Sequence, residues 1–190
     1  MEKITPQAAQ QVFSTLFSEL GTVFSNIDGE ALSEFSTVLL NGRRLFFLGA
    51  GRSGLAVKMA AMRFMHLGLA VHAVGEVTCP AIAENDVLLV ASGSGRTPMI
   101  LNAVKTARAA GASVLAVTTS PQTPLAEYAQ QQIVLPAAVK DAHNNNVSVQ
   151  YAGSLFEQAT VIVLDALFHL MWKQSALPAE TLWARHANME

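Results

Sequence analysis

The stretch Ser92-Gly-Ser-Gly-Arg-Thr97 combines glycines and hydroxyl side chains in a way that suits an anion. It follows a short apolar run and precedes a helical pattern. The glycines let the backbone approach a ligand, and the hydroxyls stand beside the unpaired amides of a helix start. This combination predicts a phosphate site. Its members are Ser92, Gly93, Ser94, Gly95 and Thr97. The simpler alternative is a turn in which Ser94 or Thr97 caps the helix.

A second glycine-rich stretch, Gly49-Ala-Gly-Arg-Ser-Gly54, also lies between a strand pattern and a helical pattern. It satisfies the G-x-G-x-x-G fingerprint of dinucleotide-binding proteins, and Glu76 near the end of the next strand could contact a ribose. Two observations count against a dinucleotide site. Such a site needs no second hydroxyl-rich anion loop, and too little chain follows the fifth predicted strand to form a substrate domain.

Glu157 is the strongest candidate for proton transfer. It lies in the first turn of a long helical pattern, residues 155–172, where the positive end of the helix dipole favours an ionised carboxylate. The spacing Ser154-Leu-Phe-Glu157 also fits a capping box, and spacing alone favours that alternative. His66 ends a helical pattern, where histidine commonly complements the helix dipole, and His186 lies in a tail of the kind that often frays.

Alternating strand and helix patterns position these residues. Near-continuous apolar strands separated by helices predict an α/β fold whose parallel sheet is covered on both faces, with ligands beyond the carboxyl ends of the strands. The predicted strands are residues 45–48, 70–74, 87–91, 114–118 and 132–135, and the helices between them are 53–66, 98–110 and 124–130. We expect a single domain over residues 1–190, consisting of N-terminal helices (1–40), an αβ core (44–136), the long helix (151–173) and a tail (174–190).

Composition narrows the function classes. The net charge of -2 provides no basic surface for nucleic acid, and the single cysteine, Cys79, excludes an internal disulfide framework. No signal peptide is recognisable, and the apolar stretch 159–172 is interrupted by Asp165 and His169 and is too short to span a membrane. We expect a soluble, cytoplasmic protein without a metal site. The apolar stripe of the first helix, residues 6–24, favours a homo-oligomer.

The two loops and the αβ alternation resemble the sugar isomerase (SIS) domain family, in which paired loops hold a phosphosugar. Further segments are similar to the 6-phospho-3-hexuloisomerases within that family. These segments are Ala61-Met-Arg-Phe-Met-His-Leu-Gly68, Gly75-Glu-Val-Thr-Cys-Pro-Ala81, Tyr151-Ala-Gly-Ser-Leu-Phe-Glu157 and Arg185-His-Ala-Asn-Met-Glu190. The resemblance covers nearly the whole chain. Arg96 and Cys79 depart from the small polar residues expected at their positions.

The resemblance implies a doubly wound αβα sandwich with a five-stranded parallel sheet in flavodoxin-like order. It also implies interconversion of D-arabino-hex-3-ulose 6-phosphate and D-fructose 6-phosphate through a cis-enediolate, the formaldehyde-fixing chemistry of the ribulose monophosphate pathway. No cofactor is implied, and the implied assembly is a tetramer. Another phosphosugar isomerase, acting on an aldose or a heptulose phosphate, and a non-catalytic sugar-phosphate sensor are the alternatives.

The resemblance also implies roles for individual residues. Glu157 would be the base, and one carboxylate on one face of the sugar can serve both proton transfers. His186, on a tail docked at its own or a neighbour's active site, would assist ring opening, and His66 would lie near the pocket. The serine-rich loop would hold the phosphate. The residues expected to orient the sugar are Gly51, Arg52 and Ser53.

Overall fold

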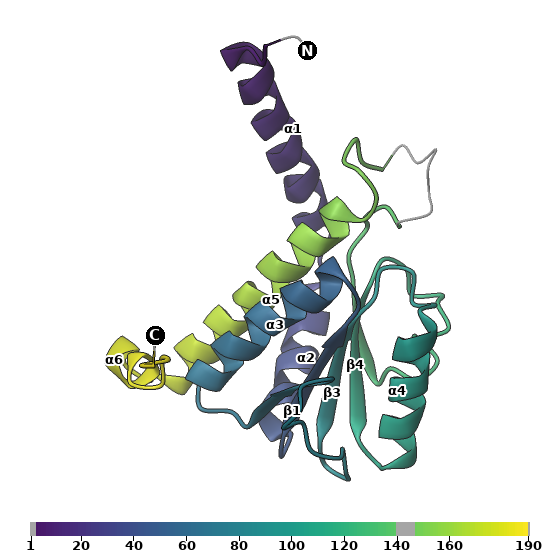
Figure 1. Cartoon of the computed structure of the whole chain (residues 1–190), viewed down its shortest axis with the longest axis vertical. Helices are drawn as coiled ribbons and strands as arrows, with labels where there is room; N and C mark the ends of the chain where they lie inside the picture. Colours follow the sequence, from purple (N-terminus) through teal and green to yellow (C-terminus); the bar gives the residue numbers. More distant parts are fainter. Residues whose placement is uncertain (1–2, 140–146, 190) are drawn as a thin grey trace.

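A parallel sheet of five strands runs through the computed structural model, which describes residues 3–139 and 147–189 (Figure 1). The strands are β1 (Leu45–Gly49), β2 (Val71–Ala73), β3 (Val87–Ala91), β4 (Ser113–Thr118) and β5 (Gln131–Val134). They lie in the order β2-β1-β3-β4-β5, and every neighbouring pair is parallel. The predicted fold class and strand order are therefore confirmed.

The central strands are apolar on both faces because both faces are covered. Phe47 and Leu89 point into one core, together with residues of the long C-terminal helix. Phe46 and Leu88, one position earlier, point into the other core. All four side chains are buried, as the period-two alternation of strands requires when a sheet is the middle layer.

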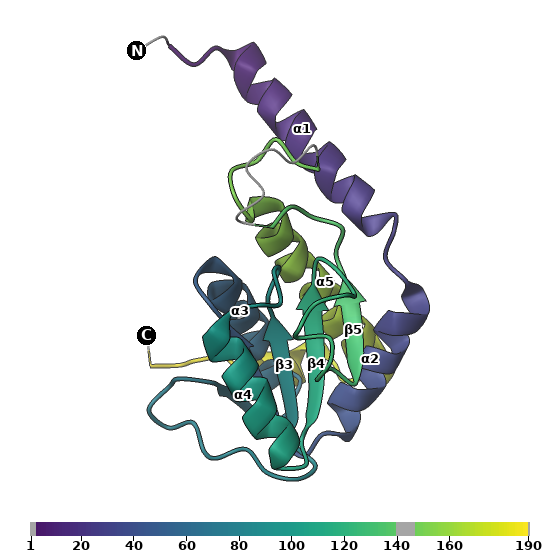
Figure 2. The same ribbon diagram turned by 90° about the vertical axis from the view of Figure 1, so that its right-hand side faces the viewer.

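Helices cover the sheet on both faces. The helices are α1 (Pro6–Phe24), α2 (Gly29–Asn41), α3 (Arg52–His66), α4 (Pro98–Ala109), α5 (Ser154–Ser175) and α6 (Ala179–Trp183). Helices α2, α3 and α5 cover one face and α4 covers the other, which gives the three-layer sandwich (Figures 1 and 2). Helix α3 packs lengthwise against α5.

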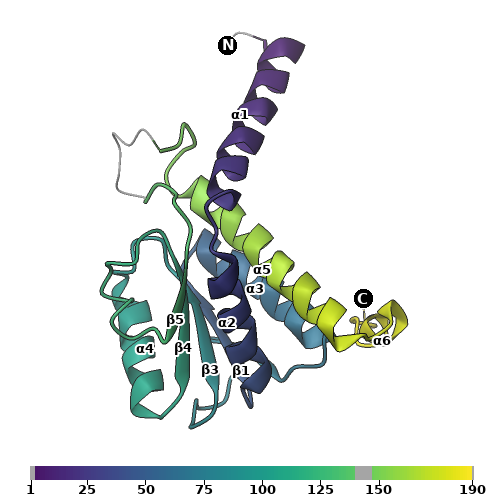
Figure 3. The same ribbon diagram turned by 180° about the vertical axis from the view of Figure 1, so that it is seen from behind.

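Helix α1 projects from the sandwich, as the view from behind shows most clearly (Figure 3). Thr5 caps its start by accepting a hydrogen bond from the Ala8 N–H at 3.1 Å. Near its other end Val23 is buried in the main core, whereas Phe13 and Phe17 on the projecting part are exposed. The C-terminal tail with α6 lies at the end of α5 that is farther from α1 (Figure 1).

A buried carboxylate ties the amino end of β3 to the chain before β1. Asp86, whose side chain has no exposed surface, pairs with Arg44 at 2.6 Å and with Arg43 at 3.2 Å. It also accepts a hydrogen bond from the Ala83 N–H at 2.8 Å. Burial alone would raise the pKa of Asp86. The hydrogen bonds from Arg44, Ala83 and Arg43 outweigh this effect and lower the pKa to about 2.

Two expectations about helices need correction. Residues 124–130 form turns and not a helix, because their amides bond to nearby carbonyls and to neighbouring segments; the Leu125 N–H, for example, donates to the Gly95 carbonyl at 3.1 Å. The apolar stretch judged too short for a membrane belongs to α5, whose 22 residues are long and apolar enough to span one. Half of that apolar window is buried inside the fold, as in the core helix of a soluble protein.

Candidate active site

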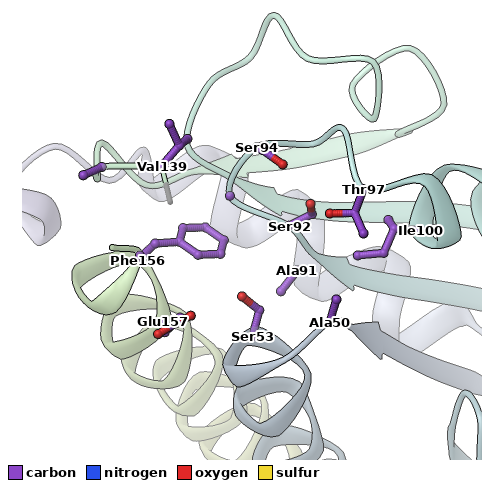
Figure 4. Close-up of a pocket in the computed structure, with 13 residues that line it drawn as sticks. Ala50, Ser53, Ala91, Ser92, Ser94, Thr97, Ile100, Val139, Phe156 and Glu157 are labelled. Carbon is purple, nitrogen blue, oxygen red and sulfur yellow. The ribbon is translucent and has the colours of Figure 1, made fainter. Parts of the chain in front are cut away.

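A pocket lies at the carboxyl edge of the sheet, where the starts of α3, α4 and α5 converge (Figure 4). It is lined by Ala50, Ser53, Ala91, Ser92, Gly93, Ser94, Thr97, Ile100, Ala138, Val139, Gly153, Phe156 and Glu157. Three helix N-termini point their unpaired amides and positive dipole ends toward this region, which favours a bound anion. The pocket thus brings Glu157 together with most of the predicted phosphate loop.

The serine-rich loop owes its shape to close contacts with the segment after β4. Gly95 has a φ of 58°, and a Cβ atom on it would lie 2.5 Å from the Thr123 side chain. The Gly93 carbonyl accepts hydrogen bonds from the Thr119 hydroxyl at 2.8 Å and from the Thr118 hydroxyl at 3.3 Å. Glycine at position 95 is therefore required both by the backbone conformation and by the space available.

The hydroxyl groups of this loop are directed to the pocket and do not cap α4. Thr97 occupies the N-cap position, but its side chain makes no capping hydrogen bond. Ser94 accepts only a local bond from the Arg96 N–H at 3.3 Å. Within the described part of the chain, the hydroxyls of Ser92 and Thr97 form no hydrogen bond with protein atoms. Thr97 therefore has the N-cap position that the simpler alternative gives it, but neither its side chain nor that of Ser94 caps α4, and these hydroxyls are available to a ligand.

The first glycine-rich loop has a backbone reason for its glycines. A Cβ atom on Gly49 would lie 2.8 Å from the backbone of Ser53 and Gly54, and one on Gly54 would lie 2.7 Å from the Gly49 carbonyl. Both glycines are therefore explained by the close packing of α3 on β1. The fingerprint does not require a bound nucleotide to account for them. Glu76 is exposed and forms an ion pair with Lys58 at 3.3 Å. Its position therefore gives no support for a contact with a ribose.

Glu157 forms an ion pair with Arg52 across the start of the two packed helices α3 and α5. The Glu157 side chain is 6% exposed, whereas that of Arg52 is 64% exposed. Gly153 is the N-cap of α5, and Ser154 bonds back to the Tyr151 carbonyl at 2.8 Å. The capping-box alternative is therefore wrong, because the carboxylate faces α3 and the pocket.

Two residues of the first loop lie outside the pocket lining. Gly51 has a φ of 58° and is the N-cap of α3, and the exposed Arg52 side chain follows it. From this loop, Ala50 and the buried Ser53 line the pocket. Figure 4 shows Glu157 on α5 across the pocket from Ser92 and Thr97.

His66 and His186 contact each other far from the pocket of their own chain. His66 ends α3, and the rise of 1.5 Å per residue places it about 20 Å along the helix from Ser53. Its ring stacks on His186 with 5.1 Å between centroids, and His186 also stacks on Trp183 at 4.9 Å. Burial, His186 and Arg63 together lower the pKa of His66, which favours its neutral form at pH 7.

The tail is held to α3 by a backbone contact as well as by the stacked rings. Arg185 donates a hydrogen bond to the His66 carbonyl at 2.8 Å, at the end of the helix where the dipole favours a cation. The guanidinium also lies against Gly68, whose φ is 99°. The tail is thus docked within its own chain on the end of α3, and not at the carboxyl edge of the sheet, where Glu157 lies.

Sequence reasoning missed the apolar wall of the pocket. Phe156, Ile100 and Val139 line it, and the Phe156 ring would lie 3.3 Å from a Cβ atom on Gly93. In the sequence, only its position next to Glu157 indicates that Phe156 lines the pocket. Cys79 is partly buried and packs beside the core that α4 covers. Among residues 3–139 and 147–189, no three His, Cys, Asp or Glu side chains are grouped to hold a metal ion.

The chain is similar to known proteins of one family. The family model for the SIS domain matches residues 38–170. The chain is 45% identical over 177 residues to the 3-hexulose-6-phosphate isomerase of Mycobacterium gastri, covering 93% of this chain and 89% of that one. It is 34% identical to the 3-hexulose-6-phosphate isomerase of Bacillus subtilis, with 92% and 95% covered.

A solved structure agrees with these relatives. The chain superimposes with a TM-score of 0.81 and 26% identity on a Methanococcus jannaschii protein whose structure was taken to indicate a 3-hexulose-6-phosphate isomerase. The match covers 95% of this chain and 99% of that chain.

Proposed function

The chain belongs to the SIS domain family, and on this basis we propose that it interconverts D-arabino-hex-3-ulose 6-phosphate and D-fructose 6-phosphate. The observation that carries the proposal is the placement of the buried Glu157 carboxylate across one pocket from a hydroxyl-lined anion loop. Relatives that cover most of the chain carry the name of this isomerase. The expected pathway is the ribulose monophosphate route of formaldehyde fixation.

The reaction moves a carbonyl group by one carbon and needs one well-placed base. Glu157 removes the proton from C2 of the hex-3-ulose, and the C–H electrons form the C2–C3 double bond of a cis-enediolate as the negative charge moves to O3. Return of that proton to C3, with transfer of the O2 proton to O3, leaves the carbonyl at C2. Because C2 and C3 lie side by side on one face of the intermediate, a single carboxylate reaches both carbons.

The phosphate group binds at the serine-rich loop in this proposal. The hydroxyls of Ser92, Ser94 and Thr97 and the Gly93 amide would hold it, helped by the N-termini of the surrounding helices. Gly95, predicted as a further member, would shape the loop, because its N–H donates to the Ser92 carbonyl at 3.2 Å. Gly51, Arg52 and Ser53 would orient the sugar. Because Arg52 already pairs with Glu157, it holds the carboxylate of the free protein at the edge of the pocket.

The two histidines can act only in another copy's pocket, because about 20 Å of α3 separates them from the pocket of their own chain. We propose that His186, supported by His66, assists opening of the fructose 6-phosphate ring in a neighbouring subunit. Mixed assemblies test this idea. Refolding Glu157→Gln together with His186→Ala should restore part of the activity that each variant lacks alone. No restoration would contradict action between subunits.

The proposal includes a cytoplasmic homo-oligomer built from one domain of residues 1–190, with a tetramer expected from the resemblance. The exposed apolar side chains Val12, Phe13 and Phe17 on the projecting α1 support association of copies. No nucleic acid, membrane or cofactor is part of the proposed activity. Light scattering during size-exclusion chromatography measures the number of copies directly.

Proton NMR with fructose 6-phosphate in deuterium oxide tests the reaction. The expected result is loss of the C3 proton signal together with appearance of a 3-ulose phosphate. Exchange at C1 would instead identify an aldose–ketose isomerase, and binding without exchange would identify a sugar-phosphate sensor. Either of these results would overturn the proposal.

A further inference from the structure

One carboxylate on α1 holds three consecutive residues of the chain before α5. Glu19 accepts hydrogen bonds from the Ser148 hydroxyl at 2.8 Å, the Val149 N–H at 2.7 Å and the Gln150 side-chain amide at 2.9 Å. The Ser148 hydroxyl in turn accepts a bond from the Gln150 N–H at 3.0 Å. Glu19 therefore acts as an anchor that links α1 to a segment about 130 residues later.

The anchored segment leads directly into the turn that carries Glu157. Ala152 has a φ of 52°, a left-handed conformation that residues with a Cβ atom rarely adopt. Gly153 then lines the pocket and caps α5, and the Ser154 hydroxyl donates to the Tyr151 carbonyl at 2.8 Å. Strained backbone of this kind persists only where the surrounding structure holds it on both sides. Helix α5 holds one side, and Glu19 holds the other.

The Glu19 carboxylate is suited to this task at neutral pH. Burial raises its pKa, but the hydrogen bonds from Gln150, Val149 and Ser148 lower it more, so the group stays ionised. Charged acceptors form stronger hydrogen bonds than neutral ones. The matched SIS segment begins at residue 38, so this anchor lies outside the part of the chain that defines the family.

We propose that Glu19 is a positioning residue for the active site: by anchoring residues 148–150 it holds the strained turn at Ala152 and thereby fixes the start of α5 and the Glu157 carboxylate. The inference rests on the proposed function only in taking Glu157 as the base. It assigns to α1 an indirect part in catalysis, through the chain before α5, in addition to its exposed apolar surface.

The variant Glu19→Gln tests the anchor, with Glu34→Gln as the control because Glu34 is an exposed acid on α2. Hydrogen–deuterium exchange should be faster at residues 148–157 of Glu19→Gln and unchanged in the control. The kcat of Glu19→Gln should fall between about 5- and 100-fold, since a displacement of the order of 1 Å costs a reacting group up to about 100-fold. The KM should stay within about twofold, because the phosphate loop is untouched.

Several results distinguish positioning from mere stabilisation. Gln150→Ala should slow turnover in the same way, and adding it to Glu19→Gln should cost less than the sum of the two single effects. Gln150→Ala also serves as the test variant if Glu19→Gln fails to fold. Unchanged exchange at residues 148–157 would overturn the anchor, and faster exchange with normal kcat would overturn its catalytic role. If the unaltered protein isomerises no hexulose phosphate, the proposed function fails, while the exchange measurement still decides the anchor.

Discussion

Replacing Glu157 with glutamine should remove catalytic activity and leave the fold intact, because glutamine can still accept a hydrogen bond from Arg52. Glutamine keeps the size of the side chain and one oxygen that Arg52 can bond, but it cannot take up a proton as a base. Loss of a positioned acid–base group costs about 10²–10⁴-fold in rate. At about 1.4 kcal/mol for each factor of ten, the barrier rises by roughly 3–5 kcal/mol.

The same substitution should hardly change stability. The Arg52 side chain is 64% exposed, so water can solvate the guanidinium when its partner loses its charge. A pair that is largely solvated on one side contributes about 1 kcal/mol or less. For a chain of 190 residues, the midpoint of thermal unfolding should therefore fall by no more than about 4 °C.

The assay compares Glu157→Gln with unaltered protein and with the acid control Glu34→Gln. Initial rates of fructose 6-phosphate formation give kcat, loss of the C3 proton signal in deuterium oxide gives enolisation, and calorimetry gives binding of fructose 6-phosphate. Binding should remain within about threefold if the phosphate loop supplies most of the affinity, a factor worth less than about 1 kcal/mol. A kcat within tenfold of normal would refute the assignment of Glu157 as the base.

Three further predictions concern the loop and the buried ion pair. Ser92→Ala should raise KM by about 10-fold or more, because a hydrogen bond to a charged group contributes roughly 1.5–3 kcal/mol; unchanged KM in steady-state kinetics would contradict the phosphate assignment. Gly95→Ala should lower both phosphate binding and the unfolding temperature, because its Cβ atom would lie 2.5 Å from Thr123; calorimetry and thermal unfolding measure both. Asp86→Asn should lower the free energy of unfolding at pH 7 by about 2 kcal/mol, because the folded pKa of Asp86 is about 2 against an ordinary 3.8. That contribution is complete above pH 3.8 and disappears as the pH falls through about 2, so the variant should lose less stability than the unaltered protein in acid denaturation.

Much of the fold was predictable because its signals are local. The apolar run at residues 87–91 and the helical spacing of residues 6–24 match β3 and α1 residue for residue. The prediction of a helix over residues 124–130 failed because that segment bonds to the serine-rich loop and to β4, which a reading of its own periodicity cannot reveal.

The candidate site was predictable only in part. Ser92, Ser94 and Thr97 could be chosen because glycines and hydroxyls in a loop between strand and helix suit an anion wherever they occur. The apolar wall formed by Phe156 and Ile100 could not be chosen, since an apolar side chain in a helix is far more often core than pocket. The anchor at Glu19 left no local signal, because its three donors lie about 130 residues away.

By itself the sequence determined the order of the strands along the chain, most of the helices between them, the parallel sheet and the two glycine-rich loops at its carboxyl edge, because periodicity and turn chemistry act over a few neighbouring residues. The tertiary structure decided what the polar side chains do. Ser154 and Glu157 have the spacing of a cap, yet the carboxylate pairs with Arg52, 105 residues earlier, because the packing of α3 on α5 brings the two together. The same packing keeps His66 and the pocket at opposite ends of one rigid helix, a separation that no local pattern records.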